Sequence, residues 1–280
     1  MQIPKQEGMT VMKKMIAMML VVLMGLSMVS GAMADKLDDV LAAGKLICAT
    51  DAAWAPFEYI GANGEVTGSD LELAKYIAEQ LGVELEVINV AFDSISTYLI
   101  NDEADLSLSA MTITEERKET IAFSDPYTVA QQYIIVLEDN TSVATIEDLA
   151  GAAIGVHLGT TGDFLISDEI MMGKLMNTGA QCMQYKFLTD AALALKNGEL
   201  GAVVCDTMLA ENLVAVNGGL KCFPLTDKDG NATIEELGIA MKKGEDAFVA
   251  KINEIIAPVI ADGTVDAWIV EHSELASAIN

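Results

Sequence analysis

Most of the chain alternates short apolar runs, which are typical of strands, with amphipathic segments, which are typical of helices. A first series contains LICAT, a helix-like stretch at 69–82, the alternating run VELEVINV, a helix at about 94–101 and the strand-like ADLSLSA. The same order restarts after Ile146 with EDLAG, AAIGVHLG, a helix from about Gly162, QCMQYK, a helix at 190–196 and LGAVVCD. The sequence therefore predicts two successive α/β units.

The clearest single helix is predicted for SDLELAKYIAEQLG, residues 69–82. Its apolar residues recur at helical spacing, Ser69 and Glu72 have the spacing of a capping box, and Gly82 is a typical helix stop. We expect the Ser69 side chain to cap the first turn.

A length of 280 residues suits two lobes of about 100 to 150 residues each. DPYTVAQQYIIVLED is extended in character and predicts a crossover between lobes near residues 127–131, and a second crossover is expected near residues 233–237. Two helices, at about 246–261 and 265–271, would then complete the chain on the first lobe. The expected fold is an α/β protein with a ligand cleft between lobe 1, residues 35–130 plus 234–280, and lobe 2, residues 131–233.

The formal net charge of −26 argues against a nucleic-acid partner, because phosphate binding requires clustered Lys and Arg and the chain has no basic run. It also disfavours an anionic membrane surface. A diffuse acidic surface either serves solubility or enriches cationic ligands near the protein.

The N-terminus has the pattern of a secretory signal peptide. Lys13 and Lys14 precede an apolar run at about 15–29, which is followed by the small-residue pattern AMA at 32–34. The run is shorter than the ~20 residues that a membrane-spanning helix needs. We expect residues 1–34 to be removed and the protein to be periplasmic or extracellular.

Four cysteines remain after this segment, and they allow three disulfide pairings: Cys48, Cys182, Cys205 and Cys222. Buried free thiols are an equally good interpretation, because three of the four lie in or beside strand-like segments. The only histidines, His157 and His272, have no partner at metal-ligand spacing, so we expect neither a metal nor another cofactor.

DKDGNATIEELG, residues 227–238, is similar to a calcium-binding EF-hand loop. Ala232 stands where such a loop needs glycine, and Gly238 stands where it needs a bidentate glutamate. A polar turn is therefore expected here.

Ligands of open α/β sheets bind at the carboxyl ends of strands. Arg117, the only arginine of the chain, follows one predicted strand end, and its planar fork suits a carboxylate. The helix start near Gly162 offers further backbone donors, and Asp206 after LGAVVC suits a cation. Together they predict a zwitterionic ligand. Taken singly, Asp206 could be an ordinary helix N-cap, Trp54 a rim residue and Thr161 a helix starter.

Several motifs resemble, in order along the chain, the bacterial extracellular solute-binding proteins (family 3) that deliver polar amino acids to ABC importers. They are ATDAAWAPFEY, GSDLELAKYIAEQLG, AFDSISTYL, ADLSLSAMTITEERKETIAFSDPY, IGVHLGTTGDF, GAVVCDTMLAEN and DGTVDAWI. The resemblance implies a type II periplasmic-binding-protein fold, two lobes joined by two crossover strands. It further implies a monomer without enzyme activity that captures a polar or charged L-amino acid by lobe closure and passes it to an ABC permease.

The resemblance also implies roles for individual residues. Arg117 is expected to bind the α-carboxylate, assisted by Thr112 and by backbone amides near Thr161. Asp206 is expected to bind the α-ammonium together with the Thr112 hydroxyl and the Ala110 carbonyl, while Asp51 lies toward the ligand side chain. The full expected site comprises Asp51, Trp54, Phe92, Ala110, Met111, Thr112, Arg117, His157, Thr160, Thr161, Gly162 and Asp206.

Ser69 departs from the family pattern, which often has an aromatic residue before the aspartate, and this leaves the side-chain pocket open. Asp51, Glu58 and Asp70 would suit a cationic ligand side chain. Two alternatives remain: a cyclohexadienyl (arogenate or prephenate) dehydratase-like enzyme on the same scaffold, and an amino-acid sensing module.

Overall fold

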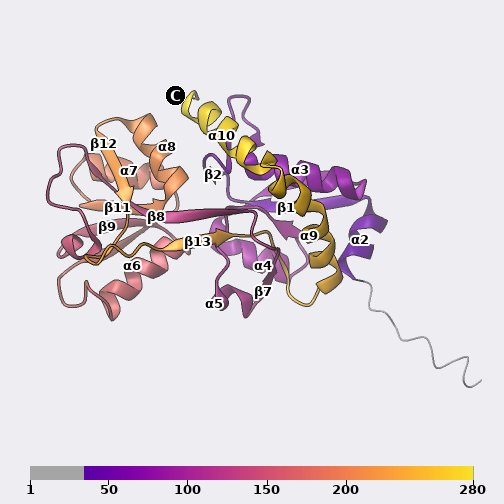
Figure 1. Ribbon diagram of the computed structural model, residues 1–280, viewed down its shortest axis with the longest axis horizontal. Coiled ribbons are helices and arrows are strands. Elements are labelled where there is room, and N and C mark those ends of the chain that lie inside the picture. Colours follow the sequence, from indigo (N-terminus) through magenta and orange to yellow (C-terminus); the bar gives the residue numbers. More distant parts are fainter. Residues whose placement is uncertain (1–34, 280) are drawn as a thin grey trace, which may run out of the picture. The chain divides into compact units, whose positions relative to one another are not determined.

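Two β-sheets organise the chain in the computed structural model, which describes residues 35–279 (Figure 1). The predicted signal peptide at residues 1–34 lies outside the described residues. The first sheet has the order β5-β1-β6-β14-β7, in which β1, β5 and β6 are parallel and β14 is antiparallel to its neighbours β6 and β7. Its strands are β1 (Lys45–Thr50), β5 (Glu84–Asn89), β6 (Leu106–Ser107), β7 (Ile121–Phe123) and β14 (Ala240–Lys242).

The second sheet has the order β10-β9-β11-β8-β12, with β10, β9 and β11 parallel and β8 antiparallel to β11 and β12. All five positions of β11 are buried, as expected of a strand that is covered on both faces. The strands are β8 (Thr128–Leu137), β9 (Ala153–His157), β10 (Gln181–Tyr185), β11 (Ala202–Asp206) and β12 (Leu220–Pro224). A small antiparallel sheet contains β2 (Ala53–Trp54), β3 (Glu58–Ile60) and β4 (Val66–Thr67).

Helices cover the sheets: α3 and α4 pack on the first sheet, and α6, α7 and α8 pack on the second. The α-helices are α2 (Lys36–Ala43), α3 (Ser69–Leu81), α4 (Ile95–Ile100), α5 (Glu115–Lys118), α6 (Thr161–Met171), α7 (Leu188–Lys196), α8 (Thr207–Asn217), α9 (Asp246–Ala261) and α10 (Thr264–Ser277). Two short 3₁₀ helices are η1 (Phe92–Ser94) and η2 (Ile146–Leu149). Within residues 35–279, no helix is long and apolar enough to cross a membrane.

Strands β8 and β13 (Ile234–Leu237) pair antiparallel at the two positions where crossovers were predicted. Gln131 lies opposite Ile234, and Thr128 lies opposite Leu237. Figure 1 shows the two strands side by side. After β13, the chain adds β14 to the first sheet, so its C-terminal part joins elements built from the N-terminal part. The lobe limits stay a prediction, and "lobe 1" and "lobe 2" below denote the segments defined above.

Helix α3 begins at the predicted residue, Ser69, and stops at Gly82 as predicted, but its N-terminal cap differs from the prediction. Gly82 adopts the left-handed conformation that terminates a helix, with φ 71°. The predicted Ser69 cap is wrong, because Gly68 occupies the N-cap position and the buried Ser69 hydroxyl has no hydrogen-bond partner among the described residues. The chain passes so close to Phe57 here that only glycine fits the capping position.

Of the two interpretations of the cysteines, the structure supports buried or half-buried free thiols for all four. Burial raises the pKa of the Cys48 thiol to about 12. The loop that is similar to an EF-hand is a polar turn in which the Asp227 carboxylate accepts backbone N–H groups of Asp229 and Asn231. The Lys174 ammonium lies 3.0 Å from the same carboxylate.

Candidate functional site

Side chains of both lobes enclose a small central cavity of about 10 Å³. All of its lining residues except Ser109 belong to the expected ligand site. The lining consists of Trp54, Phe92, Ser109, Ala110, Thr112, Arg117, Thr160, Thr161 and Asp206. The structure thus brings together residues at or after the ends of five strands, β1, β5, β6, β9 and β11, although their role in binding stays a prediction.

Two expected site residues do not line this cavity or the larger one described below. Met111 is buried in an apolar cluster of lobe 1 with Ile95 and Leu99, because its side chain points into the core. Gly162 lies against Gln132, and a β-carbon there would be 2.9 Å from the Gln132 Oε1 atom. Gly162 therefore permits close packing behind the cavity.

Arg117 links the two lobes from the short helix α5. The Thr114 side chain caps this helix by accepting the Arg117 backbone N–H. The Arg117 guanidinium donates from Nη1 to the Thr112 carbonyl at 2.8 Å and from Nη2 to the Gly159 carbonyl in lobe 2 at 3.1 Å. Its central carbon lies 5.4 Å from the centre of the Phe92 ring, a cation–π distance. Burial lowers the pKa of Arg117, but a guanidinium stays charged at neutral pH.

Asp206 is the last residue of β11 and occupies the N-cap position of α8, yet its side chain makes no capping hydrogen bond. Its Oδ1 atom accepts instead from Gln132 Nε2 at 2.5 Å. Burial, followed by repulsion from the Glu235 carboxylate, raises the pKa of Asp206 to about 7. The ordinary N-cap interpretation of Asp206 is therefore wrong for its side chain, which belongs to a buried polar cluster.

Glu235 and Gln132 belong to this cluster, and sequence reasoning missed both. Glu235 Oε2 accepts from Thr161 Oγ1 at 2.9 Å, from Thr112 Oγ1 at 3.0 Å and from Gln132 Nε2 at 3.2 Å. Both missed residues lie within the crossover strands, whereas the search followed strand ends. The period-two alternation of a strand was an available signal, because Glu235 shares a face with the buried Leu237.

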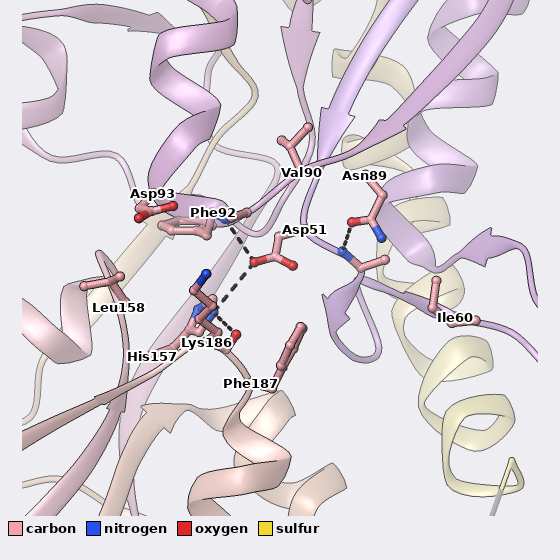
Figure 2. A pocket seen from close by; sticks show the side chains of 12 residues that line it. Asp51, Ile60, Asn89, Val90, Phe92, Asp93, His157, Leu158, Lys186 and Phe187 are labelled. Atoms are coloured by element: carbon pink, nitrogen blue, oxygen red, sulfur yellow. Dashed lines mark hydrogen bonds and ion pairs between the residues drawn. The ribbon is translucent and has the colours of Figure 1, made fainter.

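A second, larger cavity of about 550 Å³ shares Phe92 with the central one. Figure 2 shows its labelled lining, which carries carboxylates at Asp51 and Asp93 and an ammonium at Lys186. The Asp51 carboxylate accepts the Phe92 N–H at 3.0 Å and lies 3.6 Å from His157 Nε2 in lobe 2. Burial raises the pKa of Asp51 and lowers that of His157. Asp51 and His157 thus lie where the two cavities approach each other, beside Phe92.

Two further carboxyls, at Glu58 and Asp70, lie behind the central cavity. Both are almost fully buried, with 0% and 1% exposure, and neither lines either of the two cavities described above, so a preference for a cationic ligand side chain through these two carboxyls stays a prediction. Asp70 Oδ2 accepts the Ala110 N–H and the Tyr127 hydroxyl, each at 2.9 Å. Ala110 has the positive φ of 45°, so Asp70 stabilises a strained residue in the cavity wall.

Glu58→Gln is expected to stabilise the protein more at about pH 7 than at about pH 5, relative to the wild type. Burial, followed by repulsion from Asp70, raises the pKa of Glu58 well above its ordinary range. Such a carboxyl stabilises the folded state fully below its unfolded pKa of about 4.3 and loses this contribution as the pH rises toward the folded pKa. Urea unfolding at both pH values measures the difference, with the exposed Glu84→Gln as control. A pH-independent difference for Glu58→Gln would contradict the argument.

Two α/β groups of elements, paired crossover strands and a shared polar cavity define the class of two-lobed solute-binding proteins. A sequence model of the bacterial extracellular solute-binding proteins, family 3, matches residues 46–272. The ABC transporter arginine-binding protein 1 of Escherichia coli (strain K12) is 33% identical over 233 residues, 81% of this chain and 91% of that protein. A probable histidine-binding protein of Neisseria gonorrhoeae is 32% identical over 221 residues, 78% of this chain and 79% of that protein.

Solved structures agree with these relatives. An amino acid ABC transporter substrate-binding protein of Streptococcus pneumoniae, bound to L-arginine, has a TM-score of 0.78 and 28% identity. The similarity covers 85% of this chain and 98% of that one. The chain belongs to the bacterial extracellular solute-binding proteins, family 3. The predicted family and the predicted two-lobed α/β fold are both confirmed.

Proposed function

We propose that this protein binds a polar or charged L-amino acid between its lobes and delivers it to an ABC importer. The observation that carries the proposal is the shared lining of the central cavity by Arg117 of lobe 1 and Asp206 of lobe 2. A half-buried guanidinium suits an α-carboxylate, and a buried carboxylate suits an α-ammonium. The arginine-binding and histidine-binding relatives support the same ligand class.

Binding would proceed by lobe closure. A cavity of about 10 Å³ has room for about one water molecule, so the lobes must separate to admit an amino acid. Strands β8 and β13 are the only segments predicted to cross between the lobes, and we assign the hinge to them. The contact of Arg117 with Gly159 and that of Asp51 with His157 would break on opening. The ligand would stabilise the closed form through contacts that it makes only there.

We propose L-arginine as the first ligand to test and L-histidine as the second. Asp51 and Asp93 of lobe 1 offer two carboxylates in the larger cavity, which suit a cationic side chain, although the Lys186 ammonium of lobe 2 lines the same cavity. The protein would act as a monomer outside the cytoplasm, exported by residues 1–34, with the permease subunits of the importer as partners. It would release the amino acid unchanged.

A thermal-shift screen of the common L-amino acids tests the proposal. A ligand at about 100 times its Kd stabilises the folded state by about 2.7 kcal/mol, so the true ligand should raise the melting temperature clearly. We expect the largest shift with L-arginine. If no amino acid raises the melting temperature, amino-acid capture is wrong. Turnover of prephenate or arogenate in a parallel assay would instead support the enzyme alternative.

A further inference from the structure

We propose that Glu235 is a positioning residue that makes the Thr112 and Thr161 hydroxyls accept hydrogen bonds from the ligand's ammonium group. This inference rests on the proposed amino-acid binding and adds to it a residue on the crossover strand β13. Glu235 does not itself line the central cavity, whereas both threonines do. Its effect on the ligand therefore passes through their hydroxyls.

The hydrogen count gives the direction of each bond. A hydroxyl has one hydrogen and two lone pairs, whereas an ionised carboxylate can only accept. Thr112 and Thr161 both donate to Glu235 Oε2, at 3.0 and 2.9 Å, so the only hydrogen of each hydroxyl is used in that bond. The two hydroxyl oxygens lie 3.4 Å apart at the cavity wall. Toward the cavity they can therefore only accept, which suits an ammonium and disfavours a carboxylate.

Gln132 holds the second carboxylate of the cluster in place. Its Nε2 donates both to Asp206 Oδ1 and to Glu235 Oε2, so the amide bridges the two acids. Gln132 is fully buried, with 0% exposure, which fixes this bridge in the interior. Two carboxylates and two accepting hydroxyls thus gather on the side of the cavity where Asp206 lies, while Arg117 supplies the guanidinium.

Of the two roles expected for Thr112, the arrangement favours the contact of its hydroxyl with the ligand's ammonium. While Thr112 donates to Glu235, it cannot also donate to the ligand's carboxylate, as an assistant of Arg117 would. It also connects binding to closure, because Thr112 belongs to lobe 1, Thr161 to lobe 2 and Glu235 to a crossover strand. The pair of accepting hydroxyls is complete only when the lobes meet, so the ammonium is recognised in the closed form.

The test compares Glu235→Gln with Glu236→Gln, which removes the same charge from an exposed position of the same strand. Calorimetry would use L-arginine and 5-guanidinopentanoate, which lacks the α-amino group. The glutamine amide can donate to the hydroxyls and turn their hydrogens toward the cavity. Glu235→Gln should therefore lower the preference for L-arginine over the analogue by about tenfold to a hundredfold, the effect of hydrogen bonds to a charged group. Glu236→Gln should leave it unchanged.

Other outcomes separate the possible failures. Equal weakening of both ligands by Glu235→Gln would mean that Glu235 is only structural and would overturn the inference alone. If the wild type binds neither L-arginine nor any other amino acid, the proposed function fails, and the inference with it. If Glu235→Gln does not fold, Thr161→Val provides the same comparison, because it removes one of the two accepting hydroxyls. Thr161→Ser, which keeps a hydroxyl, should retain the preference for L-arginine. An unchanged preference in Thr161→Val would also overturn the inference.

Discussion

Replacing Arg117 with alanine should weaken amino-acid binding by about thirtyfold to several thousandfold, or about 2–5 kcal/mol. The guanidinium is half-buried at the wall of the central cavity, and its hydrogen bonds to the Thr112 and Gly159 carbonyls hold it where a ligand carboxylate would bind. Its loss would leave that carboxylate buried without a matching charge. Isothermal calorimetry with L-arginine, or with the amino acid that gives the largest thermal shift, measures the change.

Arg117→Lys is the matched control for charge. Lysine keeps a positive charge but has no planar fork, so it cannot contact Thr112, Gly159 and a carboxylate in the same geometry. We expect the affinity of Arg117→Lys to lie between the affinities of the wild type and of Arg117→Ala. An unchanged Kd for Arg117→Ala would refute the assigned role. A large loss of folding stability in the same variant would point to a structural role instead.

Gly68→Ala should destabilise the folded state by about 2–6 kcal/mol, the sum of a strained backbone conformation and an overpacked contact. A β-carbon at Gly68 would lie 1.9 Å from the Phe57 carbonyl oxygen and 2.4 Å from its carbon, and φ is 141°. Phe57 cannot move away easily, because its side chain is 1% exposed and its carbonyl accepts the Asp70 N–H. Urea unfolding measures the loss.

Gly64→Ala separates the two causes of this destabilisation. Gly64 also has a positive φ, of 81°, but a β-carbon there would meet no described atom within 4 Å. It should therefore cost only the conformational strain, about 1–2 kcal/mol. Equal losses for the two variants would show that the close approach to Phe57 is unimportant. Since Phe57 precedes Glu58 and its carbonyl binds Asp70, we also expect Gly68→Ala to weaken ligand binding.

Local patterns predicted most of the elements. The helix expected at about 246–261 matches the bounds of α9, and Gly82 marked the end of α3. The helix expected at 265–271 proved longer, because α10 continues to Ser277 through half-apolar turns that pack on other helices. The cap of α3 was predicted wrongly, because the close approach of the chain to Phe57, which the helical periodicity does not record, selected Gly68.

The site residues likewise include some that the sequence predicted and some that it did not. The strand-end rule led to Arg117 and Asp206, which do line one cavity. It did not distinguish the carboxyls of Glu58 and Asp70, which are buried behind that cavity, from Asp51, which lines the larger one. It missed Glu235 altogether. The side chains of all four residues carry a carboxyl group, and how deeply each one is buried depends on the elements that pack over it.

The sequence alone determined the order of strands and helices, the acidic charge and the placement of a single arginine after a strand end. Each of these depends on composition or on residues that are near one another in the chain. Only the tertiary structure decided which acids meet at the cavity. The pairing of β8 with β13 brings Gln132 beside Glu235, 103 positions further along, and folding brings both to Asp206. Such contacts depend on the geometry of burial and pairing, which no local pattern of residues records.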